Sequence, residues 1–240
     1  MRKGFAAVAF LFFLAGCLYA QTADEIIQKH IQAKGGLEAI KSKTSLRASG
    51  TLDVMGMSLP LTVMTKRPNL QRTEVPIGND SVIDAFDGKT RWKLNPAMGI
   101  TTPSPASPEE TAAASETVDF DGALIGYKEK GSTVELVGKE MLGAQEAYKL
   151  KLKASSGREQ EIYIDAASYH QVRVVAKTAT PEGEQMVDSR ASDYRMIDGI
   201  AVAHVIEVTV GPTDMKMTFD KVEWNVDLPD SLFVMPLPTP

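Results

Sequence analysis

Apolar residues along this chain recur with two different periods, and the point where the period changes separates a helical start from a long run of strands. Isoleucines within residues 26–31 have helical spacing. Residues 22–25, Thr-Ala-Asp-Glu, have the spacing of a capping box, and the glycine pair at 35–36 supplies the left-handed conformation that ends a helix. We therefore predict a first helix over about residues 23–34.

From Ser45 onward the apolar period becomes two, as in a strand with one buried face. Similar segments follow, separated by glycine, proline and Asp-Gly turns. A sheet of about eleven or twelve strands in hairpin succession is too wide to stay flat, so it must curl or close. The predicted class is α+β, mainly antiparallel β, with helices covering the concave face. The strands that the alternation marks cover about residues 45–54, 59–63, 82–86, 90–94, 133–138, 146–153, 159–165, 170–178, 185–196, 200–210 and 215–226.

The alternation stops between about residues 95 and 131. Four prolines in residues 96–108 exclude a strand ladder there, because each lacks an amide donor and restricts the residue before it. Ser107 and Glu110 then have capping-box spacing, with proline at the first helical position. We expect this insertion to contribute one or two helices, to carry apolar residues over about 118–127, and to act as a lid over the sheet.

The N-terminus has the organisation of a secretory signal. A basic start precedes an apolar run, over residues 5–14, that is too short to span a bilayer. The run closes in Leu14-Ala15-Gly16-Cys17, which resembles the bacterial lipobox, where the cysteine thiol receives a diacylglyceryl group. We predict a lipoprotein-type signal peptide over residues 1–16, lipid attachment at Cys17 and a short tether over residues 17–22.

Cleavage after Ala20 is the alternative, and it would discard Cys17. It would place Leu18 three residues before the cut, where the ordinary signal peptidase prefers a small side chain. A lipoprotein of this kind is expected to face the periplasm on a lipid anchor in the outer membrane. Cleavage after Ala20 would instead give a soluble periplasmic protein.

Composition and charge narrow the classes of partner. A hydrophobic content of 43% permits a substantial core, and we expect one domain over residues 23–240 and a monomer. The net charge is -5, and acidic and basic residues are interspersed along the chain. No basic stripe therefore indicates nucleic acid binding. One cysteine supports neither a disulfide framework nor a thiolate metal site. No later apolar run reaches transmembrane length, so membrane attachment is expected through lipid on Cys17.

Six short segments of turns, caps and apolar positions carry a family resemblance. Together they resemble the outer-membrane lipoprotein-sorting protein family, whose members share the LolA/LolB-like fold. They identify an architecture better than an activity. The segments are Thr22-Ala23-Asp24-Glu25-Ile26-Ile27 with Gly35-Gly36, Lys66-Arg67-Pro68-Asn69, Ala85-Phe86-Asp87-Gly88-Lys89-Thr90-Arg91-Trp92, Asp119-Phe120-Asp121-Gly122, Val134-Glu135-Leu136-Val137-Gly138-Lys139-Glu140 and Asp230-Ser231-Leu232-Phe233.

The resemblance implies an unclosed barrel whose apolar hollow is lidded by helices and receives lipid or lipoprotein acyl chains. It thus implies a cell-envelope lipoprotein that binds an apolar ligand, in lipoprotein sorting or lipid transfer. The alternative is a non-catalytic structural or interaction module of the envelope whose own side chains fill the hollow. The candidate lining residues are Leu61, Val63, Phe86, Trp92, Phe120, Leu124, His204 and Ile206.

Catalytic and metal-binding constellations are not indicated, so we expect neither an enzyme nor a cofactor. The histidines at 30, 170 and 204 are isolated in the sequence, and no serine lies in a nucleophile elbow. Asp119 and Asp121 are predicted to be solvated loop acids. His204 alternates with apolar neighbours, so it either lines a ligand cavity or is a hydrogen-bonded core histidine.

Overall fold

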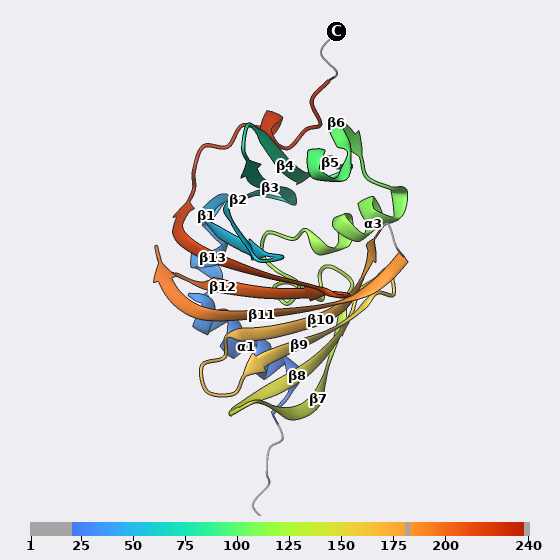
Figure 1. Ribbon diagram of the computed structural model, residues 1–240. Helices are drawn as coiled ribbons and strands as arrows, with labels where there is room; N and C mark the ends of the chain where they lie inside the picture. Colours follow the sequence, from blue (N-terminus) through green and yellow to red (C-terminus); the bar gives the residue numbers. More distant parts are fainter. Residues whose placement is uncertain (1–20, 181–182, 238–240) are drawn as a thin grey trace, which may run out of the picture.

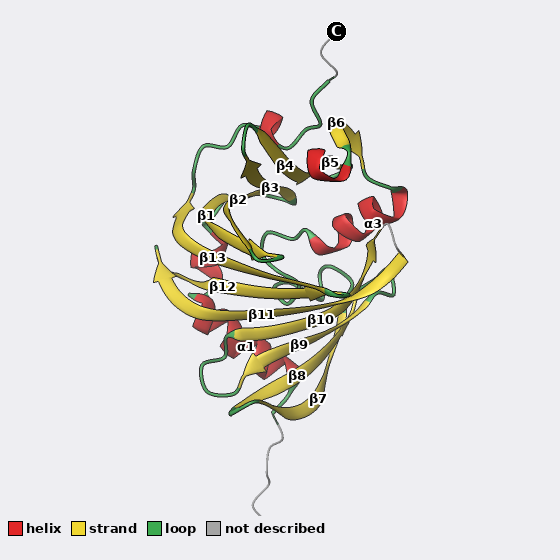
Figure 2. Ribbon diagram, in the orientation of Figure 1, coloured by secondary structure: helices red, strands yellow, loops and turns green. Residues whose placement is uncertain are grey.

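The computed structural model describes residues 21–180 and 183–237, which form one antiparallel sheet of thirteen strands with helices against it (Figures 1 and 2). The order across the sheet is β6-β5-β4-β3-β2-β1-β13-β12-β11-β10-β9-β8-β7. The edge strands β6 and β7 are not neighbours in this order, so the barrel is open and the predicted curled, unclosed architecture is confirmed. The strands are β1 (Ser45–Val54), β2 (Met57–Lys66), β3 (Leu70–Ile77), β4 (Asp80–Phe86), β5 (Arg91–Asn95), β6 (Ile100–Pro105), β7 (Thr133–Leu142), β8 (Gln145–Lys153), β9 (Glu159–Asp165), β10 (Gln171–Thr180), β11 (Gly183–Ile197), β12 (Ile200–Val210) and β13 (Thr213–Trp224).

Two strands were not predicted by the alternation, and they account for the larger strand number. In β3 the residues from Gln71 to Glu74 are polar on both faces, so no period of two is visible. The exclusion of a ladder by prolines is wrong for β6, where Pro105 pairs with Trp92 and Ser104 with Lys93. An edge strand tolerates proline because one side of its backbone has no partner strand to donate to.

In the part of the chain that the structure describes, three α-helices accompany the sheet, and the first and third begin at the predicted caps. The helix α1 (Ala23–Lys34) and the helix α3 (Pro108–Thr117) both have complete capping boxes. The helix α2 (Leu37–Lys41) was not predicted, and single 3-10 turns occur at Pro96–Met98 (η1) and Asp230–Leu232 (η2). Within residues 95–131, α3 is the one α-helix, because residues 118–131 form turns instead.

The position of α3 shows which face of the sheet is concave. Its Glu110 carboxylate pairs with Lys93 on β5 at 2.5 Å, while its Ala113 carbonyl accepts from Arg158, whose guanidinium also donates to Lys177 on β10. The strands β5 and β10 are far apart in the sheet order, so the sheet must curl around α3 for the helix to reach both. Figure 1 shows α3 between these two parts of the sheet. We call the face that contacts α3 the inner face.

Half of the inner face is closed by α1 and the turns that follow α3. Ile26 and Ile27 of α1, together with Leu124, pack against Leu150 of β8 and Ile162 of β9 in one buried cluster. In Figure 1, α1 lies behind strands β9 to β12, so it covers the inner side of that part of the sheet. We call this region the covered half.

The outer face of β2 to β5 is covered by residues 226–233, which we call the C-terminal strap. Phe233 is fully buried, and it packs with Leu228 and with Met64 of β2. The Lys66 ammonium donates to the Leu228 carbonyl at 2.8 Å, which fixes this segment to the sheet. The segment 230–233, which contributed to the family resemblance, is therefore an anchor of the C-terminal strap.

The predicted signal peptide over 1–16 and the predicted lipid attachment at Cys17 lie outside the described residues. Among the residues that are described, no helix has the length and apolar character needed to cross a membrane.

Candidate functional site

An apolar strip on the inner face is built from strands alone. Five of its residues are buried and nine are only partly buried, although they pack against one another. We call this set the open strip. Because α1 and α3 contribute no residue to it, its partly buried side chains lack the cover that α1 gives to the covered half. The members are Ala48, Leu61, Val75, Phe219 and Val222, with Leu46, Leu52, Leu59, Val63, Val82, Ile197, Val202, Ile206 and Met217 partly buried.

The strand register explains how alternating residues become a continuous strip. Leu52 on β1 pairs with Leu59 on β2 and with Met217 on β13. Met217 pairs in turn with Ile206 on β12. Residues directly opposite one another across a ladder project from the same face, so four neighbouring strands place apolar side chains in one row.

Three of the predicted lining residues meet in this strip. Leu61 is 2% exposed at its centre, and Val63 and Ile206 pack around it while remaining partly exposed. The sequence indicated these positions by alternation alone, and the curl of the sheet brings them together from β2 and β12.

Phe86 and Trp92 lie on opposite faces of the sheet, so they cannot line the same hollow. Phe86 pairs with Arg91, whereas Trp92 pairs with Ala85, one position out of phase. Phe86 lies on the inner face and borders a hollow of about 210 Å³ beneath α3. Trp92 is on the outer face, where its indole N–H donates to the Phe233 carbonyl at 2.7 Å. Alternation along one strand does not tell which residues of the next strand share its face, because that depends on the length of the connecting loop.

Leu124 and Phe120 also lie apart from the open strip. Leu124 belongs to the covered half, where it is 3% exposed against α1. The Phe120 ring lies under the Arg67 guanidinium, at 4.6 Å from the ring centroid, and meets Trp224 edge-on with centroids 6.3 Å apart. Phe120 therefore joins the turns after α3 to the β2–β3 connection rather than to the strip.

His204 is buried within β12 and is hydrogen bonded. Only 2% of the residue is exposed, and its Nδ1–H donates to the Val202 carbonyl at 3.1 Å. A carbonyl can only accept, so the bond places the ring proton on Nδ1. This is the arrangement expected of a satisfied core histidine.

An ionic cluster around the buried carboxylate of Asp121 fixes the turns after α3 to the rest of the fold. The burial of Asp121 shows that the prediction of a solvated loop acid is wrong. Asp121 is 6% exposed, and its carboxylate accepts from Arg67 at 2.5 and 2.9 Å and from Lys41 at 2.8 Å. Burial raises the pKa of this carboxyl, but the hydrogen bonds from Arg67 and Lys41 outweigh it and lower the pKa to about 2. Asp119 pairs with Lys130 instead, at 2.5 Å and with partial exposure.

The helix α3 is attached much more loosely than these turns. Of its ten residues, only Glu110 and Ala114 are buried. Burial raises the pKa of the Glu110 carboxyl, but the Lys93 ammonium and the Ser107 amide lower it further than burial raises it. One ion pair, one long hydrogen bond from Arg158 to the Ala113 carbonyl and one buried methyl group thus hold the helix over the hollow beside Phe86.

Comparison with solved structures identifies the architecture. A LolA superfamily protein from Nitrosomonas europaea aligns over 90% of this chain and 98% of its own, with a TM-score of 0.56 and 13% identity. A DUF1329 family protein from Desulfovibrio piger ATCC 29098 aligns over 88% of this chain and 96% of its own, with a TM-score of 0.57 and 11% identity. The chain has a LolA-type fold. No protein-family model matches the sequence, and no curated protein sequence is significantly similar to it.

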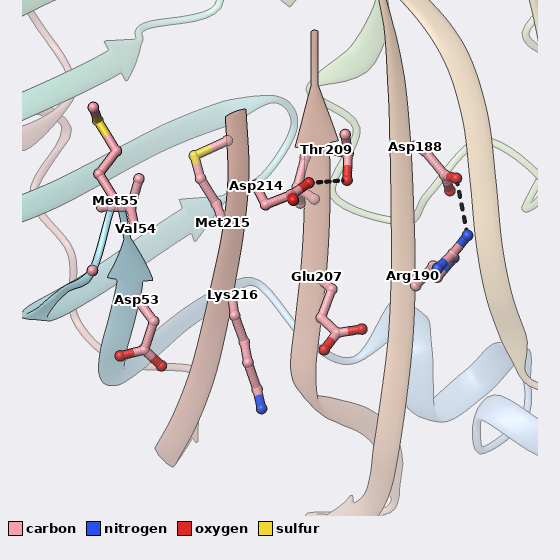
Figure 3. Close-up of a pocket in the computed structure, with 12 residues that line it drawn as sticks. Asp53, Val54, Met55, Asp188, Arg190, Glu207, Thr209, Asp214, Met215 and Lys216 are labelled. Carbon is pink, nitrogen blue, oxygen red and sulfur yellow. Dashed lines mark hydrogen bonds and ion pairs between the residues drawn. The ribbon is translucent and has the colours of Figure 1, made fainter. Parts of the chain in front are cut away.

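A second hollow lies outside the apolar interior of this LolA-type fold. It measures about 550 Å³ and is lined by residues of β1, β11, β12 and β13 and by the turn after β1, and it includes none of the eight predicted residues (Figure 3). Lys216 pairs across the ladder with Asp53 on one side and Glu207 on the other, and Glu207 pairs with Arg190. Alternating charges on neighbouring strands stabilise a solvated sheet face. Within the described residues, no group of three or more metal-ligating side chains is assembled.

Proposed function

We propose that this chain is a non-catalytic binding protein of the bacterial cell envelope that holds an apolar chain along the open strip. The apolar chain belongs to a lipid or to the acyl chains of a lipoprotein, and the function is lipoprotein sorting or lipid transfer. The observation that carries the proposal is the open strip itself, where apolar side chains on an inner face are only partly buried. A contiguous apolar surface without cover is typical of a binding site.

The energetics favour an acyl chain as the occupant. Each methylene removed from water contributes about 0.8 kcal/mol, so a chain lying along several strands gains binding free energy without any specific polar contact. Met217 in the strip has a flexible thioether that adapts to ligands of varied shape. The LolA-type fold and the family resemblance of the sequence support the same ligand class.

An environment-sensitive fluorescent fatty acid tests the proposal. We expect delipidated protein to bind it with a dissociation constant in the micromolar range or lower, with a blue-shifted emission because the probe enters an apolar site. The soluble fluorophore without its acyl chain is the control and is expected not to bind. Folded, delipidated protein that fails to bind the fatty acid would contradict the proposal.

That negative result would favour the structural module as the function. The covered half supports this second candidate, because α1 and residues 124–127 already fill its part of the inner face with their own side chains. The two candidates therefore differ in whether the open strip takes up a ligand or stays empty of one.

We further propose that the protein is held at the outer membrane by lipid on Cys17, facing the periplasm. The lipobox-like residues 14–17 support this anchor. Replacing Cys17 with serine is expected to abolish incorporation of radiolabelled fatty acid and to release the protein from membranes without detergent. Detection of Gln21 as the mature N-terminus of the wild-type protein would show that the cut falls after Ala20 and that the anchor does not exist.

The sequence predicts a lid in the insertion at about 95–131, and we propose that α3 alone is the part that opens. Weakly packed elements open most easily, so amides of α3 are expected to exchange with solvent at least about tenfold faster than those of β12. The hydrogen-bonded amides of Asp121, Gly122 and Ile125, in turns fixed by the ionic cluster and the covered half, serve as the internal control and should exchange slowly. A bound fatty acid should slow exchange in α3. Protection of α3 equal to that of the strands would show that the helix is static packing.

A further inference from the structure

A small pocket between α1 and the turns after α3 has a different chemistry from the open strip. It measures about 130 Å³, which corresponds to the volume of about four water molecules. Its walls come from α1, residues 121–125, the start of β10, Tyr194 on β11 and Ala201 on β12. His30 and Lys34, one helical turn apart on α1, both line it. It lies beside Leu124 and Ile125, whose side chains are buried in the interior.

Lys34 brings a positive charge to this pocket and is not paired directly with any described carboxylate. Its ammonium donates to the backbone carbonyl of Asp121 at 3.1 Å, and it forms no ion pair within the described chain. The Asp121 carboxylate is already engaged by Arg67 and Lys41. Burial lowers the pKa of Lys34, while Asp121 and Asp119 oppose that effect. A desolvated ammonium with one hydrogen bond out of three is costly unless an anion lies beside it.

The two histidines that line the pocket are uncharged at neutral pH, so the positive charge at the pocket comes from Lys34. The His30 Nδ1–H donates to the Tyr169 carbonyl at 2.9 Å, and burial, partly opposed by this bond, lowers the pKa of the ring to about 4. His170 stacks on Tyr194 with ring centroids 4.3 Å apart. Burial also lowers the pKa of His170, against a raising effect of Asp165. Both rings are therefore neutral at pH 7, and their uncharged nitrogens do not compete with Lys34 for an anion.

Backbone donors are available in the same wall. Ala123 and Leu124 line the pocket, and their amides form no hydrogen bond with any residue that the structure describes. Gly122 precedes them with a φ of +91°, in the left-handed region. A Cβ at this glycine would lie 3.9 Å from the Lys34 Nζ, so the turn and the ammonium are close. Free amides after a left-handed residue are a common setting for bound oxyanions.

We propose that this pocket binds an oxyanion, a carboxylate or phosphate group, with the Lys34 ammonium as its charged contact. The volume accepts such a group but not a large ligand. The group belongs either to a small free anion or to the head of an amphiphile whose tail extends away from the pocket. The site does not depend on lipid binding in the open strip, because no residue of the open strip lines it.

Titration of the full chain with acetate, inorganic phosphate and octanoate tests this proposal, with the imidazole NMR signals of His30 and His170 as the readout. We expect saturable shifts with at least one of the three anions. Lys34→Gln should weaken that anion's binding by at least about tenfold, because a charged hydrogen bond is lost. Lys34→Arg keeps the charge and should keep the binding. Lys89→Gln makes the same change of charge at an exposed turn residue and should bind like the wild type.

The comparison of anions identifies the source of the group. Equal affinity for acetate and octanoate indicates a free anion, and much tighter octanoate binding indicates an amphiphile. Linear, unsaturated shifts with all three anions, or equal affinity in Lys34→Gln, would overturn the proposal and leave a pocket filled by water. If Lys34→Gln does not fold, the pKa of Lys34 is measured in the wild type with and without the anion. The proposal requires this pKa to rise when the anion is bound, and a constant pKa would overturn it.

Discussion

Replacing Asp121 with alanine is expected to lower the free energy of unfolding by about 3 kcal/mol. Among the described residues, Asp121 is the one carboxylate that pairs with Arg67 and Lys41, and it is itself 6% exposed, so the change leaves both cations without their partner in a partly desolvated site. It leaves the Arg67 guanidinium with backbone carbonyls of Ile40 and Lys43 as its remaining described hydrogen-bond partners. Chemical denaturation monitored by circular dichroism measures the effect.

Glu184→Ala is the matched control for this prediction. Its partner is Lys177, and both side chains of this pair are 62% exposed. A solvated surface pair contributes little, so the control is expected to leave the stability almost unchanged. Equal effects of the two substitutions would show that the cluster around Asp121 is no more important than a surface ion pair.

The same carboxyl predicts a pH dependence with a definite sign. The pKa of Asp121 is lowered in the folded state, from an ordinary value of 3.8 to about 2. Its contribution is therefore complete above pH 4 and is lost as the pH falls from about 4 to 2. Within this window, Asp121→Asn should lose less stability than the wild type does, because it has no proton to take up at this position. Parallel loss in both proteins would exclude Asp121 as a source of acid lability.

Replacing Ile206 with aspartate is expected to weaken fatty acid binding by about 100-fold or more. Ile206 packs in the open strip against other apolar residues, so the new carboxylate would have to be desolvated against an acyl chain. Equilibrium titration with the fluorescent fatty acid measures the loss, and circular dichroism establishes that the variant is folded.

Ser192→Asp separates a local effect from a change in net charge. Ser192 is exposed on the neighbouring strand β11. It follows Ala191, the inner-face residue that pairs with Ile206. Its side chain therefore projects from the outer face. The variant should bind the fatty acid like the wild type. If both aspartates weaken binding equally, the ligand is held by general electrostatics or elsewhere on the protein.

The sequence predicted the elements that are specified by residues close to one another along the chain. The caps at Thr22 and Ser107 involve residues three positions apart, so short spacing identifies them. Alternation likewise marked eleven of the thirteen strands. It missed β3, where Arg72 and Glu74 form an ion pair on one face and Gln71 and Thr73 are polar on the other.

Long-range pairing could not be predicted in the same way. Arg67 and Asp121 both lie in segments that carried the family resemblance, but they are 54 residues apart and meet only through the curl of the sheet. Lys34 and Asp121 are brought together over a longer span, of 87 residues. The face of Trp92 depends on the geometry of one hairpin, which alternation does not determine.

Photo-crosslinking with a diazirine-bearing fatty acid tests the central claim most directly, because it reports where the acyl chain lies. Mass spectrometry of the labelled protein should find the label on peptides of β1, β2, β12 and β13, with Leu52, Leu59, Ile206 or Met217 among the modified residues. Unlabelled fatty acid should compete, and Ile206→Asp should lose the label. Labelling confined to the charged outer hollow around Lys216, or no specific labelling of folded protein, would contradict the proposal that the open strip binds an apolar chain.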